Sequence, residues 1–380
     1  MSPPSLAVGT TIDMLDEIAD AAVNFLLAQA ANGFSETRHW MRFPRSQGFS
    51  SQDEVHAGDV FQRAVIIDAL LDAKAELGLD LDKLISAEID YLLSCRRPAK
   101  LGAWSYFPDL PELPADADTL GQMIRILART GRSSDLGTAC KPALAILLSD
   151  GINEDGSIDT WILPRRPESH QRIQAHFVRT AWGTGADCEV MANLLDALLV
   201  WEPFRYNQIS LNAVRYIEAQ QQPAGSWLST WYYGPFYGTY ACSRLVRRLH
   251  LGSTTMQKAE VFLHQTQAED GGWGVGPGSD PLSTGLALLG LANVEAGEPA
   301  ENQLATISRS LDFLASSMQG DRAWLGAPFI KMPVNRPGGL GGPEITFGSS
   351  TITAAYCLKA TLAWRPRLVE VSKALALLSS

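Results

Sequence analysis

One short pattern recurs six times along this chain, and it limits the possible folds more than any other feature. Each copy is a helical stretch that ends in a turn, usually Gly-rich and followed by a Trp or another apolar residue. The two clearest copies also place Gln221 and Gln267 four residues before the Gly of the turn. The turn positions are Gly33, Gly102, Gly156, Gly225, Gly271 and Arg322. A unit this small cannot bury its own apolar face, so the copies must pack against one another.

A second helix follows each turn. Asp59 opens one that Gly78 closes, and Asp118 opens one that Gly131 closes. The segment 189–200 is apolar on more than one face, and strand-like alternation is nearly absent. The sequence therefore predicts an all-α fold, an (α/α)6 barrel of six helical pairs in two concentric rings, formed by residues 1–380 as a single domain. The N-terminal ends of the inner helices are expected to open at one end of the barrel, where long loops build a pocket.

Charge and cysteine usage exclude several classes of function. The formal net charge is −10, from 31 Lys and Arg against 41 Asp and Glu, and an acidic chain lacks the basic face that nucleic acid requires. The five cysteines are dispersed, without the paired spacing of a disulfide framework or a zinc ribbon. The start of the chain lacks the basic and apolar regions of a signal peptide, and no apolar run is long enough to span a membrane. We expect a cytoplasmic protein.

The sharpest chemical feature is a pair of carboxylates, Asp116 and Asp118, at the mouth of the second inner helix. An enzyme that protonates an alkene needs a carboxylic acid that keeps its proton at neutral pH. A helix N-terminus favours the anion, but an apolar cavity and a second carboxyl two residues away both favour the protonated form. This interpretation makes Asp118 the proton donor and Asp116 its partner. The alternative is that Asp118 is only a helix cap.

The segment Asp116-Ala-Asp118-Thr119 resembles the D-x-D-D segment of the class II terpene cyclases, the squalene–hopene and oxidosqualene cyclase superfamily. In that family the middle Asp is the acid, which the resemblance assigns to Asp118. The sequence departs from the family at Thr119, where a second flanking carboxylate is expected. The six turns are likewise similar to the QW repeats of these cyclases, whose Gln and Trp residues we interpret as structural.

Two further segments extend the resemblance. Residues 231–239 are similar to a cyclase stretch that ends in Y-G-T and whose Tyr lies near the acid, which implies this role for Tyr237. In the family, an Asp is followed four residues later by a His that bonds the acid, whereas here Asp187 is followed by Met191. Asn193, Tyr237 or a bound water is the expected substitute for that His.

The predicted pocket residues follow from the chemistry of a moving carbocation, which aromatic faces stabilise. The aromatic candidates are Trp182, Trp231, Tyr233, Phe236, Phe329 and Phe347. The long loop after Phe329 also offers Lys331 and Arg336 to hold an anionic head group, and Glu344 to accept a final proton. Rival head-group residues in the first loop are Arg38, His39, Arg42 and Arg45.

The resemblance implies a class II cyclase that uses no metal and no cofactor and folds a linear prenyl chain into rings. The chain is too short for the two-barrel cyclases and is similar to a lone β domain. This implies a hydrophobic prenylated substrate, with a prenylated dihydroxybenzoic acid converted to a sterol-like meroterpenoid as the first choice. Linear terpenoids and prenyl diphosphates are the alternatives. Such a substrate makes transient contact with a membrane reasonable.

Other functions of the same barrel remain open at this point. A zinc-dependent prenyltransferase needs an Asp-x-Cys and a later His, but Asp187 and Cys188 are adjacent and no His follows His264. A diphosphate-ionising synthase needs an aspartate-rich motif, for which 16–20 is a poor match. A glycosidase would pair Asp116 with Asp187 or Glu344. A non-catalytic scaffold would have no reason to place an acid pair and aromatic residues at the same barrel end.

Overall fold

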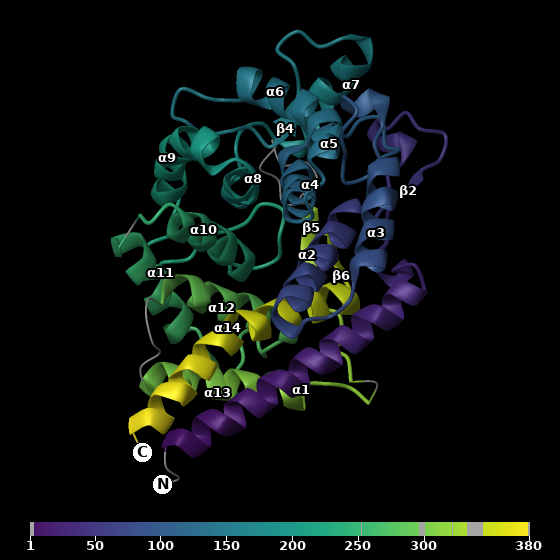
Figure 1. Cartoon of the computed structure of the whole chain (residues 1–380). Helices are drawn as coiled ribbons and strands as arrows, with labels where there is room; N and C mark the ends of the chain where they lie inside the picture. The colour runs from purple at the N-terminus through teal and green to yellow at the C-terminus, as the bar shows by residue number, and fades with distance from the viewer. Residues whose placement is uncertain (1–3, 252, 296–300, 321, 333–344, 379–380) are drawn as a thin grey trace.

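The computed structural model describes residues 4–251, 253–295, 301–320, 322–332 and 345–378. Within these residues, six helices form a closed inner ring in which each packs against the next and the last contacts the first (Figure 1). In ring order they are α2 (Val60–Leu77), α4 (Ala117–Arg129), α8 (Cys188–Trp201), α10 (Phe236–Arg248), α12 (Pro281–Val294) and α14 (Ser350–Leu378). These helices are buried over most of their surface because they contact neighbours on several sides.

Outside the ring lie helices that each precede an inner helix in the chain. They are α1 (Pro4–Ala31), α3 (Asp82–Ser94), α6 (Lys141–Asp150), α9 (Pro203–Ala219), α11 (Ser253–Gln265) and α13 (Glu301–Ser316). Helices α1 and α14 run side by side, which brings the two ends of the chain together. The predicted all-α fold, an (α/α)6 barrel, is therefore confirmed within the described residues.

The remaining helical segments are short. Between α4 and α8 lie α5 (Ser133–Asp135), α7 (Ser169–Phe177) and two π-helical turns, η4 (Leu136–Cys140) and η5 (Val178–Trp182). Within the described residues, two 3₁₀ turns lie between α1 and α2, namely η1 (Ser35–Thr37) and η2 (Arg45–Gln47), and a third, η3 (Pro98–Lys100), lies between α3 and α4.

In the part of the chain that the structure describes, six short strands occur in pairs, and all were missed at the level of sequence. Antiparallel pairing joins β1 (His39–Arg42) to β2 (Val55–Gly58), β3 (Ala115–Asp116) to β4 (Trp161–Ile162) and β5 (Pro328–Met332) to β6 (Ile345–Gly348). Strands of two to five residues are too short for alternation to be visible. Each pair lies in a loop that leads toward the N-terminal end of an inner helix, so the pairs give those loops a fixed shape.

The repeated turns share one backbone geometry, which explains the Gly pattern. The five glycines have φ between +62° and +103°, a region that side chains disfavour, and Arg322 takes the sixth position with a φ of +60°. Each repeat Trp donates its indole N–H to a carbonyl near the end of the preceding outer helix, at 2.7–2.9 Å. The pairs are Trp104 with Leu92, Trp227 with Ile217, Trp273 with Leu263 and Trp324 with Leu314.

The repeat Gln residues connect neighbouring outer helices. Gln221 follows α9 and donates to the carbonyl of Thr255 in α11 at 2.9 Å, and Gln267 follows α11 and donates to that of Thr306 in α13 at 3.1 Å. The Gln and Trp residues therefore satisfy or use carbonyls that a helix end leaves without partners.

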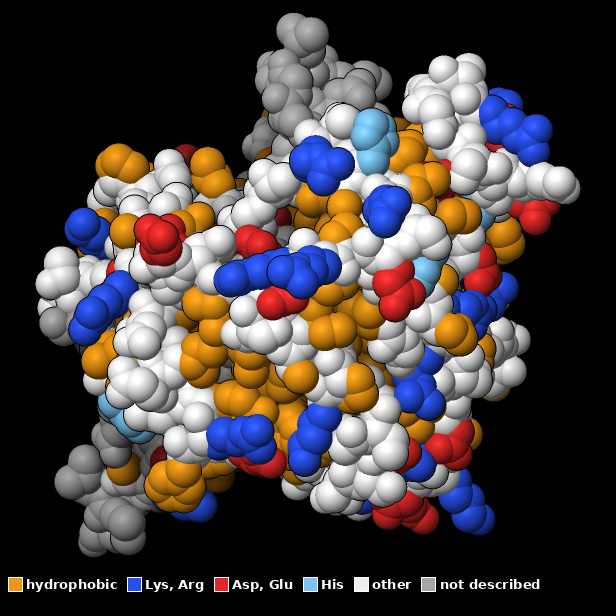
Figure 2. All heavy atoms as spheres, turned by 90° about the horizontal axis from the view of Figure 1, so that it is seen from above, with side chains coloured by type: hydrophobic (Ala, Val, Ile, Leu, Met, Phe, Trp, Pro, Cys, Tyr) orange, Lys and Arg blue, Asp and Glu red, His pale blue; other side chains and the backbone are white. Residues whose placement is uncertain are grey.

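Figure 2 shows the barrel from above, with hydrophobic side chains gathered in the middle of the face and charged side chains between and around them. None of the helices within the described residues is long and apolar enough to cross a membrane.

Candidate active site

A cavity lies at the barrel end where α2, α4 and α8 begin. Aromatic and aliphatic side chains supply most of its wall, and Asp116, Asp118, Thr119 and Thr160 are the polar exceptions besides tyrosine and tryptophan. The other lining residues are Phe43, Phe61, Tyr106, Phe107, Leu113, Trp161, Trp182, Val190, Trp231, Tyr232, Ile330 and Met332. Two carboxyl groups therefore face an otherwise apolar space, as the sequence predicted.

The structure corrects the position of the helix cap. Asp116, and not Asp118, is the N-cap of α4, because its Oδ1 accepts a hydrogen bond from the Thr119 backbone N–H at 2.6 Å. Asp118 lies within the first turn, so its carboxyl group is not used for capping. The two carboxyl groups have separate tasks: Asp116 ends the strand β3 and starts the helix, and Asp118 is left free to face the cavity.

Asp118 is buried and has a defined set of partners. Its Oδ1 accepts a hydrogen bond from Asn193 Nδ2 at 2.7 Å, and its Oδ2 contacts the hydroxyl of Tyr232. The same Asn193 amide nitrogen is 2.8 Å from the Tyr237 hydroxyl. Tyr237 stacks on Tyr232, with ring centroids 3.7 Å apart. Asn193 and Tyr232 thus fix the orientation of the carboxyl group, and Tyr237 supports both of them.

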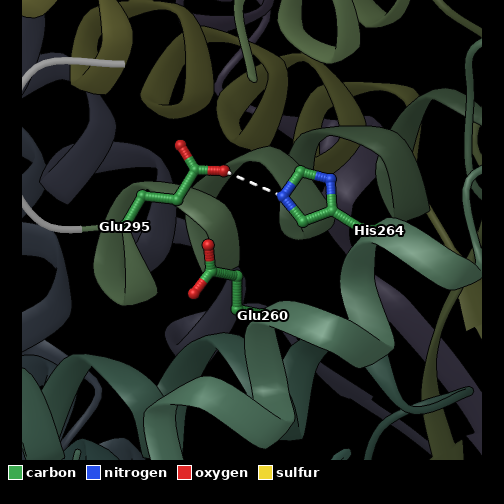
Figure 3. A group of neighbouring side chains, drawn as sticks. All are labelled: Glu260, His264 and Glu295. Carbon is green, nitrogen blue, oxygen red and sulfur yellow. Dashed lines mark ion pairs between the residues drawn. The ribbon is translucent and has the colours of Figure 1, made fainter. Parts of the chain in front are cut away.

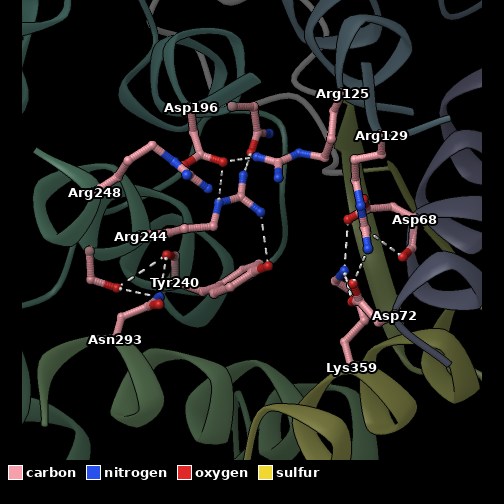
Figure 4. A network of polar contacts seen from close by, with 12 residues as sticks. Asp68, Asp72, Arg125, Arg129, Asp196, Tyr240, Arg244, Arg248, Asn293 and Lys359 are labelled. Carbon is pink, nitrogen blue, oxygen red and sulfur yellow. Dashed lines mark hydrogen bonds and ion pairs between the residues drawn. The ribbon is translucent and has the colours of Figure 1, made fainter. Parts of the chain in front are cut away.

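Arg244 determines which way the Asn193 amide points. Its Nη2 donates to Asn193 Oδ1 at 2.9 Å, so the amide nitrogen must face Asp118 and Tyr237. Arg244 is held in turn by Asp196, at 3.2 Å from Nε, and by the Tyr240 hydroxyl at 2.9 Å. Figure 4 shows this part of a larger charged network in the barrel interior, which also includes Arg125, Arg129, Asp68, Asp72, Arg248, Asn293 and Lys359. The acid is therefore positioned through the network and not by its own helix alone.

Burial raises the pKa of Asp118 from 3.8 to about 7. The removal of water from the carboxyl group is the largest cause, and the nearby Asp116 adds to it, whereas the Tyr232 and Asn193 hydrogen bonds favour the anion and oppose the shift. Burial also raises the pKa of Asp116 to about 6. Asp118 therefore keeps a proton near neutral pH, which is the state that a general acid requires.

Close packing of α4 on α8 makes the Asp118–Asn193 contact possible. Gly121 lies against the α8 backbone, where an added Cβ would come within 2.9 Å of the Leu194 Cα. A larger residue here would separate the helices that carry Asp118 and Asn193. The glycine is thus required for the close approach and not for a special backbone angle.

The loop that carries Tyr232 is fixed by two more buried carboxylates. Asp187 accepts hydrogen bonds from the Thr230 hydroxyl at 2.6 Å and the Trp231 indole at 2.8 Å. Glu189 accepts the backbone N–H groups of Thr230 and Trp231 at 2.7 and 3.0 Å. Burial raises the pKa of Glu189 to about 8. Asp187 is the N-cap residue of α8 by position, but its side chain makes no capping hydrogen bond and instead holds the loop that carries Tyr232.

The predicted aromatic residues fall into two groups. Trp182 and Trp231 line the cavity. Phe329 lies behind Tyr232 and Tyr237, at ring distances of 5.0 and 5.3 Å, Phe236 packs toward Phe262, and Phe347 stacks on His39. These three residues and Tyr233 are absent from the lining of the cavity.

The predicted polar residues are also separated. Thr119 lines the cavity and its hydroxyl lacks a hydrogen-bond partner among the described residues, as does Asp116 Oδ2. Lys331 lies half-buried in β5, where its backbone N–H bonds to Trp231. Arg336 and Glu344 lie outside the described residues. Of the rival residues in the first loop, Arg42 pairs with Glu54 at 2.8 Å and Arg38 with Asp59 at 3.3 Å.

Sequence reasoning missed Tyr232, the residue that contacts Asp118 most directly. It lies between two residues that were predicted, and only the direction of each side chain in the loop distinguishes the three. It also missed Tyr106, whose hydroxyl accepts from Gln62 Nε2 at 2.7 Å and lies 3.0 Å from His39 Nδ1. The network through Arg244 had no local signal, because its members are spread over all six inner helices, α2, α4, α8, α10, α12 and α14.

Comparison with known proteins agrees with this geometry. Residues 184–330 match the family model of the squalene–hopene cyclase C-terminal domain. The squalene–hopene cyclase of Zymomonas mobilis is 30% identical over 127 residues, which are 30% of this chain and 18% of that protein. The drimenyl diphosphate synthase of Streptantibioticus cattleyicolor is 28% identical over 163 residues, covering 40% of this chain and 29% of that protein. The matches span less than a third of the length of these relatives.

Among solved structures, the fold is similar to that of the type II terpene cyclase MstE from Scytonema, with a TM-score of 0.69 and 17% identity over 94% of this chain and 99% of that chain. MstE has also been solved in complex with geranylgeranyl dihydroxybenzoate as substrate. A cellobiose 2-epimerase from Bacillus thermoamylovorans has a TM-score of 0.54 and 12% identity, so the barrel alone does not define the chemistry. The segment 184–330 is therefore similar to the C-terminal domain of the squalene–hopene cyclases, and the fold of nearly the whole chain is that of the MstE barrel.

Proposed function

We propose that this protein is a class II terpene cyclase that protonates the terminal alkene of a prenylated substrate and drives its polycyclisation without a metal or cofactor. The observation that carries the proposal is Asp118, a carboxyl group with a pKa of about 7 that faces an aromatic cavity. A scaffold protein has no need for an acid of this kind, because a buried carboxyl group is costly unless it has a function.

The first step is a proton transfer from Asp118 to the alkene. The carboxyl O–H bond breaks, a C–H bond forms at one alkene carbon, and the other carbon becomes a tertiary cation. Asn193 and Tyr232 then stabilise the carboxylate that remains, since both contact its oxygens. Burial keeps Asp118 protonated before the reaction. Its hydrogen-bond partners favour the anion, so they make the acid strong enough to give up its proton to the alkene.

The cavity wall supports the cation that moves along the chain. Aromatic rings stabilise a desolvated cation by about 0.5–2 kcal/mol each, and Phe61, Trp161, Trp182 and Trp231 all line the space. A prefolded prenyl chain makes every ring closure intramolecular, which removes much of the entropic barrier. A dry wall also limits early capture of the cation by water.

We infer that Tyr106 and His39 take the final proton. The Tyr106 hydroxyl accepts from Gln62, so its own hydrogen is directed to His39 Nδ1, which requires a neutral imidazole with the proton on Nε2. Burial lowers the pKa of His39 to about 4, which keeps it neutral before the reaction. In the last step a C–H bond breaks, its electron pair forms a C=C bond or restores an aromatic ring, and Tyr106 accepts the proton while passing its own to His39. The product is then an isomer of the substrate.

The substrate class proposed first is a prenylated dihydroxybenzoic acid. The similarity to MstE over nearly the whole of both chains supports this choice, and the mostly aromatic and aliphatic lining of the cavity suits a prenyl chain. The similarity to a drimenyl diphosphate synthase supports a prenyl diphosphate as the second candidate. The lining within the described residues contains no Lys, Arg or His to meet a diphosphate.

The proposal is tested by incubating the purified protein with farnesyl- and geranylgeranyl-dihydroxybenzoic acids, squalene and geranylgeranyl diphosphate, each with and without EDTA. Products are analysed by LC-MS beside Asp118→Asn and a matched control, Asp135→Asn, whose carboxyl group lies in α5 outside the cavity lining. We expect an isomer of unchanged mass from wild type and control, and at least a 1,000-fold loss in Asp118→Asn, on the order of the loss typical for a proton donor. Equal activity in Asp118→Asn would refute the mechanism. Conversion of none of the substrates would refute the proposed substrate classes.

A further inference from the structure

A second group of polar side chains lies away from the cavity, between an outer and an inner helix. Glu260 and His264 are one turn apart on α11, and Glu295 follows the end of α12. Figure 3 shows the three side chains converging on a common space. Their nearest ligand atoms all lie within 4.8 Å of one another, and His264 Nε2 is 3.2 Å from Glu295 Oε1. None of the three lines the cavity that holds Asp118.

Glu295 is the observation that points to a ligand. Its side chain is only 4% exposed, and neither carboxylate oxygen has a hydrogen-bond partner among the described residues. The His264 nitrogen is close to Oε1 but does not meet it with hydrogen-bond geometry. A buried carboxylate without hydrogen bonds is costly, so such a group usually serves a function or meets an ion.

Among the described residues, the two nearby arginines direct their N–H groups to backbone carbonyls and not to the Glu295 carboxylate. Arg247 Nη1 donates to the backbone carbonyls of Ala292, Asn293 and Glu295 at 2.9, 2.9 and 3.2 Å. Arg367 likewise donates to the carbonyl of Ala292. Both guanidinium groups thus satisfy the C-terminal end of α12, and within the described residues His264 is the ion-pair partner of Glu295.

We propose that Glu260, His264 and Glu295 form a binding site for a divalent transition-metal ion, with Zn²⁺ the best match. One imidazole and two carboxylates provide the nitrogen and oxygen ligands that zinc accepts, and a water would complete four-coordination. The two carboxylates together carry the charge that a divalent ion balances, and the imidazole must release its proton when it binds the ion. The ion would join α11 to the end of α12, so its role is to brace the barrel and not to take part in the proton transfer.

The site is independent of the cyclisation chemistry, and its test does not depend on a substrate. The full chain, freed of metal by dialysis against EDTA, is titrated with ZnCl₂ by isothermal titration calorimetry, and Co²⁺ binding is followed by its visible absorption. We expect one ion per chain and a higher Tm in the presence of Zn²⁺. His264→Ala and Glu295→Gln should weaken binding at least tenfold.

The matched control is His170→Ala, which removes an exposed His that lies 3.8 Å from Glu168 without a third ligand. Its affinity for Zn²⁺ should equal that of the wild type. Circular dichroism in metal-free buffer tests whether each variant folds. If His264→Ala or Glu295→Gln does not fold, Glu260→Gln on the half-exposed side of the site provides the same test. Failure of folded wild-type protein to bind Zn²⁺, or unchanged affinity in the folded ligand variants, would overturn the proposal.

Discussion

Removal of the Tyr232 hydroxyl should make Asp118 a weaker acid. This hydroxyl contacts Asp118 Oδ2 and favours the anion, so the change Tyr232→Phe raises the pKa of Asp118 above its wild-type value of about 7. A hydrogen bond to a charged group contributes about 1.5–3 kcal/mol. At about 1.4 kcal/mol per pKa unit, the expected rise is about 1–2 units. The phenyl ring can keep the stacking contact with Tyr237 at 3.7 Å, so the change is local.

The assay is kcat/KM for cyclisation between pH 5 and pH 10. Because the protonated acid is the active form, wild-type activity should decline above pH 7, by about tenfold per pH unit. In Tyr232→Phe this decline should begin at about pH 8–9, and the plateau should be lower because a weaker acid protonates the alkene more slowly. At pH 9 the variant therefore loses less activity, relative to its own plateau, than the wild type does.

Tyr237→Phe is the matched control, because Tyr237 contacts Asn193 and the contacts of the Asp118 oxygens are to Asn193 and Tyr232. Its alkaline decline should move by less than half of the shift found for Tyr232→Phe. A decline that stays at pH 7 in Tyr232→Phe, or that moves to lower pH, would show that the hydroxyl does not stabilise the Asp118 anion and would refute this reasoning.

Three further predictions concern stability and packing. Because the folded-state pKa of Asp118 is raised, the folded protein binds a proton that the unfolded chain releases above pH 3.8, so stability is lost as pH rises toward and through about 7. Asp118→Asn lacks this loss, and its free energy of unfolding in urea should exceed that of the wild type by up to about 4 kcal/mol at pH 8 and by little at pH 4. An equal difference at both pH values would contradict the raised pKa. Gly121→Ala places a Cβ 2.9 Å from the Leu194 Cα, and it should lower the unfolding free energy by about 1–3 kcal/mol and reduce kcat. The control Gly137→Ala has no atom within 4 Å of the new Cβ, so it should leave both the unfolding free energy and kcat unchanged. Trp273→Phe loses the indole hydrogen bond to Leu263, and should lower the unfolding free energy by about 1–3 kcal/mol with kcat unchanged; a large fall in kcat would argue against a purely structural role of the repeat.

The sequence alone was sufficient to predict the architecture. Six copies of a helix and turn require a closed arrangement, and the turn itself is visible because a positive φ selects Gly at five of six positions. The pair Asp116 and Asp118 was visible for a similar reason, since two carboxyl groups at a predicted helix start are a local pattern. These features depend on backbone angles and spacing within a few residues, which a single sequence records directly.

Other features of the site depend on distances between segments far apart in the chain. The choice of cap between Asp116 and Asp118 was wrong at the level of sequence, because either Asp can cap a helix and only the final path of the backbone places Oδ1 near the Thr119 N–H. Tyr232 could not be separated from its neighbours, because the loop direction is set by Asp187 and Glu189 from another helix.

What the sequence by itself determined is therefore the helical barrel, its repeated turns and the presence of an acid pair at one end. Only the tertiary structure decided which carboxyl group caps α4, which tyrosine contacts Asp118, and how Arg244 orients Asn193 from the barrel interior. The physical reason is that helix and turn formation follow from local backbone preferences, whereas the pKa of Asp118 follows from the loss of water and from partners that lie 75 and 114 residues away in the chain.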